Sequence, residues 1–191
     1  MIKKIIGTLI MKLFGWGLDA IPHEKAKGTV MIAAPHTSNS DFFFVNAAMW
    51  QLGWDMKFMI KDSHTKNFFY GWLVKYIGGI GINRSQKNDM INYSCELFKK
   101  NPQLILVVPA EGTRLRVPKW KLGFYHIAKQ ANVPISLGFL DYKKKIAGVG
   151  KLVYPNQKTK EELFKEIEEF YNKVHAKYPE NYSPNIEEVK N

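Results

Sequence analysis

A histidine and an aspartate five positions apart, His36 and Asp41, form the most reactive arrangement in this sequence. When a carboxylate holds one nitrogen of an imidazole, the ring keeps a fixed tautomer and its other nitrogen can take a proton from an alcohol. The pair therefore predicts a general base, with His36 as the base and Asp41 as the residue that orients it. A surface histidine next to an aspartate that stabilises a helix start would give the same spacing.

A second candidate site is a Glu-Gly-Thr-Arg motif that directly follows an apolar stretch. Gly112 permits a tight backbone turn or the close approach of a ligand. The turn would present Glu111, Thr113 and Arg114, and an arginine can bind a phosphate through two parallel hydrogen bonds. A glycine turn with an exposed ion pair is the simpler alternative.

Strands and helices that alternate along the chain would position these residues. Short apolar stretches predict strands at 29–34, 57–60, 78–82, 104–108, 133–140 and 151–154. Helical patterns are found at 41–52 behind Ser40, at 66–77, at 86–100 behind Ser85, at 120–131 and at 160–178. The alternation is typical of an α/β fold, with a mixed, largely parallel sheet flanked by helices. We expect one domain over residues 1–191, with its catalytic core at 28–155 and a closing helix at 160–178.

Four of the predicted strands end just before a residue that can do chemistry or bind an anion. These residues are His36, Lys61, Arg84 and Glu111. Because ligands bind at the carboxyl ends of parallel strands, the four side chains are expected to meet at one edge of the sheet.

The charge of the chain is positive and unevenly distributed. The formal net charge is +11 over 191 residues, although residues 160–191 contain five Lys and eight Glu. The remaining basic body would attract a polyanion, such as nucleic acid, an anionic membrane or an acidic substrate and its carrier. A metal site is not expected, because the sequence has one cysteine, Cys95, and no metal-binding motif.

The first segment, residues 1–17, predicts an amphipathic helix. Its apolar residues recur at helical spacing, and lysines occupy much of the other side. Such a helix either lies in the interface of an anionic membrane or packs on its own domain. No stretch of about 18 uncharged apolar residues predicts a spanning helix, and no signal peptide is expected.

Taken together, these motifs resemble the glycerolipid acyltransferases, in particular the lysophosphatidic acid (1-acylglycerol-3-phosphate) acyltransferases. The matching motifs are His36-x-x-x-x-Asp41, Gly79-Ile-Gly-Ile-Asn-Arg84, Glu111-Gly-Thr-Arg114 and Val133-Pro-Ile135, in the order of that family. Lys61 stands where the family commonly has a lysine that helps to bind phosphate. The chain departs from the family pattern at Gly81, at Asn83 and at Pro109-Ala110, changes that leave the base intact but alter the acceptor pocket.

The resemblance implies an O-acyltransferase of phospholipid biosynthesis. It would move a fatty acyl group from acyl-CoA or acyl-ACP, its co-substrate, to the hydroxyl of a lysophospholipid, with 1-acyl-sn-glycerol-3-phosphate giving phosphatidic acid. His36 and Asp41 would be catalytic and no cofactor would be needed. The implied substrate-binding residues are Lys61, Arg84, Glu111, Gly112, Thr113 and Arg114. The implied location is the cytoplasmic face of the inner membrane, as a peripheral or monotopic protein.

Other functions remain open at this point. Within the same chemistry, the acceptor would be a different lysolipid, such as a lyso-aminoacyl lipid. Outside it, the basic charge and the aromatic residues would suit a non-catalytic protein that binds a membrane or another polyanion. Nucleic acid is not expected as a partner, because no RNA- or DNA-binding motif is present.

Overall fold

A seven-stranded sheet forms the centre of the computed structural model, which describes residues 2–82 and 87–186. The strands are β1 (Gly17–Ala20), β2 (Thr29–Ala33), β3 (Met56–Lys61), β4 (Gly79–Ile82), β5 (Ile105–Val108), β6 (Ile135–Asp141) and β7 (Ile146–Val153). Their order is β1-β7-β6-β2-β5-β3-β4, and every neighbouring pair is parallel except β6 and β7. The predicted mixed, largely parallel α/β fold is therefore confirmed.

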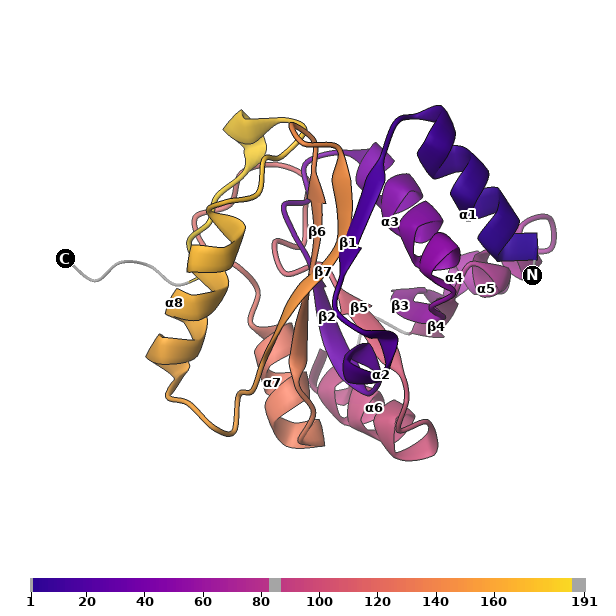
Figure 1. Cartoon of the computed structure of the whole chain (residues 1–191). Coiled ribbons are helices and arrows are strands. Elements are labelled where there is room, and N and C mark those ends of the chain that lie inside the picture. The colour runs from indigo at the N-terminus through magenta and orange to yellow at the C-terminus, as the bar shows by residue number, and fades with distance from the viewer. Residues whose placement is uncertain (1, 83–86, 187–191) are drawn as a thin grey trace.

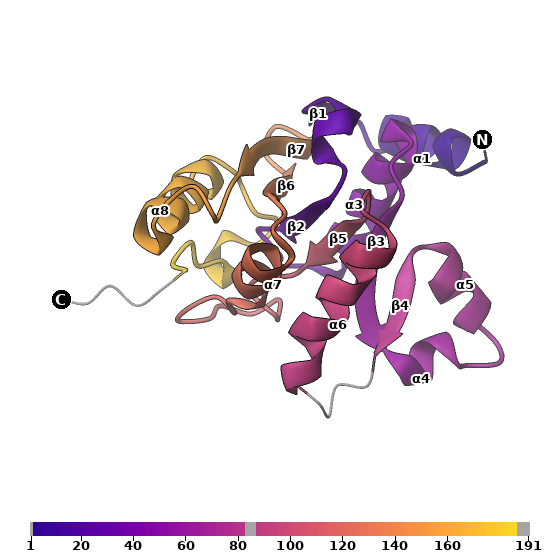
Figure 2. The same ribbon diagram turned by 90° about the horizontal axis from the view of Figure 1, so that it is seen from below.

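Helices cover both faces of the sheet (Figure 1). One face carries α1 (Ile2–Leu13) and α3 (Asn39–Leu52), and the other carries α6 (Lys87–Lys100), α7 (Gly123–Ala131) and α8 (Lys160–Tyr171). Two short helices, α4 (Asp62–Thr65) and α5 (Gly71–Tyr76), lie beside β4, far from α8 (Figure 2). The other short helices are α2 (His23–Ala26) and the 3-10 turn η1 (Pro179–Asn181).

The central strand β2 shows why both faces must be covered. Successive side chains of a strand point to opposite faces, and residues 29–32 of β2 are all buried. Val30 and Ile32 pack in the core that includes side chains of α7 and α8, whereas Met31 packs in the core that includes side chains of α1 and α3. A strand buried on both faces lies inside a sheet, so the chain that leaves β2 towards His36 emerges in the middle of the sheet edge.

Helix α1 is attached to the domain by one face only. Gly7 is buried where α1 crosses α3, and a Cβ there would lie 2.5 Å from the carbonyl oxygen of Ala47. Met11, one turn further on, is fully buried. The outer face stays exposed at Ile2 (66%), Ile5 (53%), Leu9 (62%) and Leu13 (80%). The helix packs on its own domain and still presents an apolar surface, although among the described residues no helix is long and apolar enough to cross a bilayer.

Some helices are shorter than the sequence predicts. The expected helix at 66–77 begins only at Gly71, because the Asn67 side chain accepts hydrogen bonds from the N–H groups of Phe69 and Tyr70 and holds a turn there. The closing helix ends at Tyr171 and not near 178, and the chain beyond it returns to the edge of the sheet where β2 ends. Likewise α7 begins at Gly123 and not at 120, and α1 ends at Leu13 and not at 17.

Three elements differ more strongly from the sequence-based prediction, namely β1, α2 and β7. Strand β1 and helix α2 were not predicted, because each has four residues and neither has an apolar pattern. Strand β7 begins at Ile146 and not at 151. A Cβ at Gly148 would collide with the backbone of Asp19, so β1 depends on this glycine for its close approach. Ser85, the expected cap of α6, lies outside the described residues.

Candidate active site

The carboxyl ends of three parallel strands bring the site together. Strand β2 pairs in parallel with β5 on one side and with β6 on the other, so the segments that follow these strands share one edge of the sheet. His36 follows β2, Glu111 follows β5 and Tyr142 follows β6. Residues far apart in the sequence thus become neighbours.

The predicted pair of His36 and Asp41 is joined by a hydrogen bond. His36 Nδ1 lies 3.2 Å from Asp41 Oδ2. The same oxygen accepts hydrogen bonds from the backbone N–H groups of Thr37 and Ser38, each at 2.8 Å. The other oxygen, Oδ1, accepts a hydrogen bond from the hydroxyl of Tyr142 at 2.7 Å. Four donors on a carboxylate that is 3% exposed hold it in one orientation.

Asp41 also fixes the start of α3. Ser38, and not Ser40 as the sequence suggested, caps the helix: its Oγ accepts from the N–H of Ser40, while Asp41 accepts from the N–H of Ser38. Burial opposes ionisation, but hydrogen bonds from His36, Tyr142 and Ser38 hold the pKa of Asp41 below its usual value. Both interpretations of this aspartate therefore apply, since it supports the helix and orients the histidine.

The charge of Asp41 determines the tautomer of His36. An ionised carboxylate only accepts hydrogen bonds, so the nitrogen of His36 that faces it, Nδ1, must carry the proton. The lone pair of the neutral ring is then on Nε2. His36 lines a cavity and its side chain is 22% exposed. This arrangement can accept a proton from a bound alcohol.

The side chain of Glu111 is buried against the backbone of His36 and does not reach the protein surface. It is 1% exposed, and its Oε1 accepts a hydrogen bond from the backbone N–H of His36 at 2.7 Å. Its other oxygen is buried with no hydrogen-bond partner in the described part of the chain. Burial, together with the nearby charge of Asp41, raises the pKa of Glu111 to about 8 despite the hydrogen bond from His36. The turn therefore does not present Glu111 as predicted, and this residue anchors the backbone of the base instead.

A buried carboxyl group with this pKa should make stability depend on pH. The folded chain keeps the proton of Glu111 up to pH 8 or so, whereas the unfolded chain loses it near its ordinary pKa of 4.5. The free energy of unfolding should therefore fall as pH rises between these values, by at most about 1.4 kcal/mol per pH unit from this group. Glu111→Gln cannot ionise and should remove that decrease.

Urea unfolding of wild type and Glu111→Gln at several pH values between 5 and 9 measures the difference. Glu169→Gln, at an exposed position of α8, is the matched control and should follow wild type. Equal pH dependence in wild type and Glu111→Gln would mean that Glu111 is ionised in the folded protein.

The rest of the Glu-Gly-Thr-Arg motif lies at the surface, and one residue of it reaches the cavity. Arg114 is exposed and lines the cavity together with His36. Gly112 has a φ of +70°, in the left-handed region that glycine adopts without strain, so the turn favours glycine. Thr113 uses its hydroxyl to accept a hydrogen bond from the N–H of Leu115.

One predicted phosphate ligand, Lys61, does not line the cavity beside His36. Lys61 is exposed at the end of β3, where its neighbour Ile60 lines the cavity and Lys61 does not. Arg84 lies outside the described residues.

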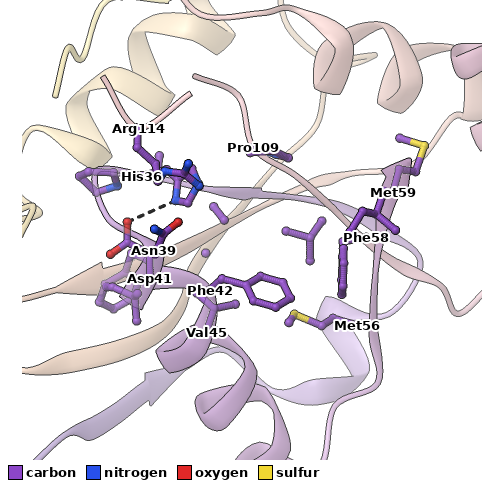
Figure 3. A pocket seen from close by; sticks show the side chains of 18 of the residues that line it. His36, Asn39, Asp41, Phe42, Val45, Met56, Phe58, Met59, Pro109 and Arg114 are labelled. Atoms are coloured by element: carbon purple, nitrogen blue, oxygen red, sulfur yellow. Dashed lines mark hydrogen bonds and ion pairs between the residues drawn. The ribbon is translucent and has the colours of Figure 1, made fainter. Parts of the chain in front are cut away.

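The cavity beside His36 has a volume of about 510 Å³. Apolar side chains form most of its wall, among them Phe42, Val45, Phe58, Ile77 and Phe139. Figure 3 shows the polar side chains of His36, Asn39, Asp41 and Arg114 at one end and Met56, Phe58 and Met59 at the other. The site thus places a base and a cation at the polar end of an apolar chamber.

Sequence reasoning missed two residues of this site, Asn39 and Tyr142. Asn39 lines the cavity next to His36, and Tyr142 bonds to Asp41. Tyr142 stands two residues after the strand predicted at 133–140, the same signal that singled out His36 and Glu111.

Comparisons with known proteins show the family and the fold of the chain. The family model described as acyltransferase matches residues 17–136. A similar solved structure is the 1-acyl-sn-glycerophosphate (LPA) acyltransferase PlsC from Thermotoga maritima. It has a TM-score of 0.58 and 16% sequence identity, over 86% of this chain and 72% of that chain. No curated protein matches the sequence. Because the family model spans more than half of its residues, the chain belongs to the acyltransferase family, as its motifs indicated.

Proposed function

We propose that this protein is an O-acyltransferase that moves a fatty acyl group from a thioester to the free hydroxyl of a lysophospholipid. The observation that carries the proposal is the position of His36, held by Asp41 at the polar end of an apolar cavity. The expected acceptor is 1-acyl-sn-glycerol-3-phosphate, which would become phosphatidic acid. A lyso-aminoacyl lipid is the alternative acceptor within the same chemistry.

The reaction needs one base and no covalent intermediate on the protein. His36 Nε2 takes the proton of the acceptor hydroxyl while the hydroxyl oxygen attacks the thioester carbonyl carbon. The new C–O bond forms, the C–S bond breaks, and the imidazolium returns the proton to the leaving thiolate. Asp41 stabilises the imidazolium while it exists, as a carboxylate does in other His–Asp pairs.

The apolar cavity is suited to an acyl chain. Its volume of about 510 Å³ lies within the range typical of small-molecule sites, roughly 300–1,000 Å³. Burial of each methylene group contributes about 0.8 kcal/mol. An acyl chain that extends from His36 towards Met56 and Met59 would place its carbonyl carbon at the polar end, beside the base.

The acceptor phosphate would be bound by the cations near the polar end. Arg114 lines the cavity and can bind a phosphate through two hydrogen bonds. From the resemblance of their motifs, we propose Lys61 and Arg84 as further phosphate ligands. Gly112 and Thr113 would form the turn that positions the side chain of Arg114. The donor would be acyl-CoA or acyl-ACP, both anionic and suited to a chain of net charge +11.

Release of free thiol from an acyl thioester tests this function. The assay would use acyl-CoA and acyl-ACP in parallel, with lysophosphatidic acid in detergent, and would identify the lipid product by chromatography. Thiol release that requires the lysolipid, with phosphatidic acid as product, is the expected result. Thiol release with a different lysolipid, and not with lysophosphatidic acid, would identify that lysolipid as the acceptor. If neither thioester is consumed with any lysolipid, the chain is not this enzyme.

We further propose that the protein acts on a membrane surface, through the outer face of α1 and the segment 68–76. That segment exposes Phe68 (90%), Phe69 (83%) and Trp72 (68%). It lies against α1, because Lys3 Nζ donates a hydrogen bond to the carbonyl oxygen of Tyr76 at 2.7 Å. An amphipathic helix with lysines along its polar side binds anionic interfaces by apolar burial and by charge. The cytoplasmic face of the inner membrane is the proposed location.

A charge on the outer face of α1 should release the protein from membranes. Leu9 is 62% exposed, so Leu9→Glu should leave the fold intact and weaken binding to vesicles that contain anionic lipid. Vesicle flotation measures the bound fraction. Gln157→Glu, an equal change of charge at an exposed turn beyond β7, is the control. Equal binding of Leu9→Glu and wild type would rule out this face of α1.

A further inference from the structure

We propose that Tyr142 is a positioning residue for the pair of His36 and Asp41. Its hydroxyl holds the carboxylate of Asp41 in the orientation that fixes the ring of His36. The proposal rests on the proposed function, in which His36 is the base. Tyr142 lies in none of the motifs that indicated the family, and its contact with Asp41 spans 101 positions of the sequence.

The hydrogen bonds around Tyr142 form a chain that runs in one direction. A tyrosine hydroxyl has a single proton, and at Tyr142 that proton goes to Asp41 Oδ1, at 2.7 Å. The contact of 2.9 Å between Ser40 Oγ and the Tyr142 hydroxyl must then be donated by Ser40. Ser40 Oγ in turn accepts a hydrogen bond from Lys177 Nζ at 2.9 Å. Every donor in the chain therefore points towards the carboxylate, an order in which successive hydrogen bonds strengthen one another.

The ring of Tyr142 cannot easily leave this position. Trp16 packs against it edge to face, with ring centroids 5.0 Å apart, and Phe44 contacts it from α3. Its backbone N–H donates to the carbonyl oxygen of His175 at 2.9 Å. Burial, with the neighbouring charge of Asp41, holds the pKa of the Tyr142 hydroxyl above its usual value, so the hydroxyl stays a donor. The donor is thus fixed by the link between α1 and β1, by α3 and by the returning C-terminal segment.

Without this donor, one oxygen of the carboxylate would have no partner. Asp41 Oδ2 is held by His36, Thr37 and Ser38, whereas Oδ1 has Tyr142 alone among the described residues. A buried carboxylate oxygen that loses its donor turns towards another donor or admits water, and either change moves the oxygen that faces His36. The ring of Tyr142 contributes packing, whereas the hydroxyl contributes the orientation.

Tyr142→Phe removes the hydroxyl and keeps the ring. We expect kcat to fall about tenfold, which corresponds to the loss of one hydrogen bond to a charged group. The KM values for thioester and lysolipid should stay near those of wild type, because Tyr142 is not part of the cavity wall. The pKa of Asp41, followed by carboxyl ¹³C NMR in the substrate-free protein, should rise towards its ordinary value. Tyr154→Phe, an exposed tyrosine after β7, should change none of these quantities.

Two results would overturn the proposal. One is an unchanged kcat in folded Tyr142→Phe. The other is a lower kcat that accompanies a lower unfolding midpoint while the pKa of Asp41 stays as in wild type, which would make Tyr142 a packing residue. If Tyr142→Phe does not fold, Ser40→Ala removes the preceding donor, and a severalfold loss of kcat is expected of it. The NMR titration needs no substrate, so it tests Tyr142 even if the wild-type protein transfers no acyl group.

Discussion

Replacement of His36 by alanine is expected to lower the turnover of acyl transfer by about 10²–10⁴-fold, the range that a positioned general base contributes. The imidazole lies at the polar end of the cavity and is held by a carboxylate, and no other titratable side chain among residues 2–82 and 87–186 combines the two. The apolar wall and Arg114 are untouched by the substitution. Substrate binding should therefore persist, and the loss should appear in kcat and not in KM.

The measurement is thiol release under saturating lysolipid, compared between wild type and His36→Ala. His126→Ala is the matched control, because His126 is an exposed residue of α7 that does not line the cavity. It should turn over like wild type. A His36→Ala protein that keeps more than about a tenth of wild-type kcat would contradict the role of His36 as the base.

The contact between His36 and Asp41 could be predicted from sequence because it is local. Five positions separate His36 from Asp41, and the turn into α3, in which the N–H groups of Thr37 and Ser38 bond to Asp41, brings the two side chains within hydrogen-bond distance. The position of His36 at a strand end was equally predictable, because a continuous apolar stretch precedes it and ends at a proline. Local contacts of this kind depend little on strand order.

The contacts of Glu111 and Tyr142 could not be predicted, because they depend on which strands are neighbours. Glu111 follows β5 and Tyr142 follows β6, and β2 lies between these two strands. The two residues therefore approach the His36–Asp41 loop from opposite sides, across 75 and 101 positions of the sequence. A glutamate beside a glycine turn looks exposed in the sequence, and only the packing around it makes it buried.

The fold was predictable where burial is complete and less so at its margins. Strands β2, β5 and β6 are buried on nearly every residue and appear in the sequence as continuous apolar stretches. Strand β1 alternates between exposed and half-buried residues, and it is a strand because β7 offers it a backbone to pair with. The helix expected at 66–77 was too long because one side chain, Asn67, competes for the N–H groups of its first turn.

Asp41→Asn is expected to lower kcat by about 10²–10³-fold, less than the loss of the base itself. Two backbone N–H groups, from Thr37 and Ser38, point at the oxygen beside His36 and would repel an amide NH₂ placed there. The asparagine should therefore turn its oxygen towards His36 and keep the Nδ1–H tautomer. What disappears is the negative charge that stabilises the imidazolium, an interaction of about 4 kcal/mol for two charges 4 Å apart near a protein surface. At 1.36 kcal/mol for each factor of ten, this corresponds to about 10³-fold, and partial access of water reduces it.

Stability separates this explanation from a simple loss of the helix cap. Asparagine still accepts the two backbone hydrogen bonds, so α3 should lose only the attraction between the charge and its N-terminus, about 0.3–1 kcal/mol. The kinetics of Asp41→Asn, its urea unfolding and the ¹⁵N spectrum of the His36 ring measure the three effects separately, with Asp19→Asn on β1 as an exposed control. A low kcat with an unchanged tautomer and near wild-type stability would assign the loss to the charge. A changed tautomer would show instead that orientation is what Asp41 supplies, and near wild-type turnover would remove Asp41 from the mechanism.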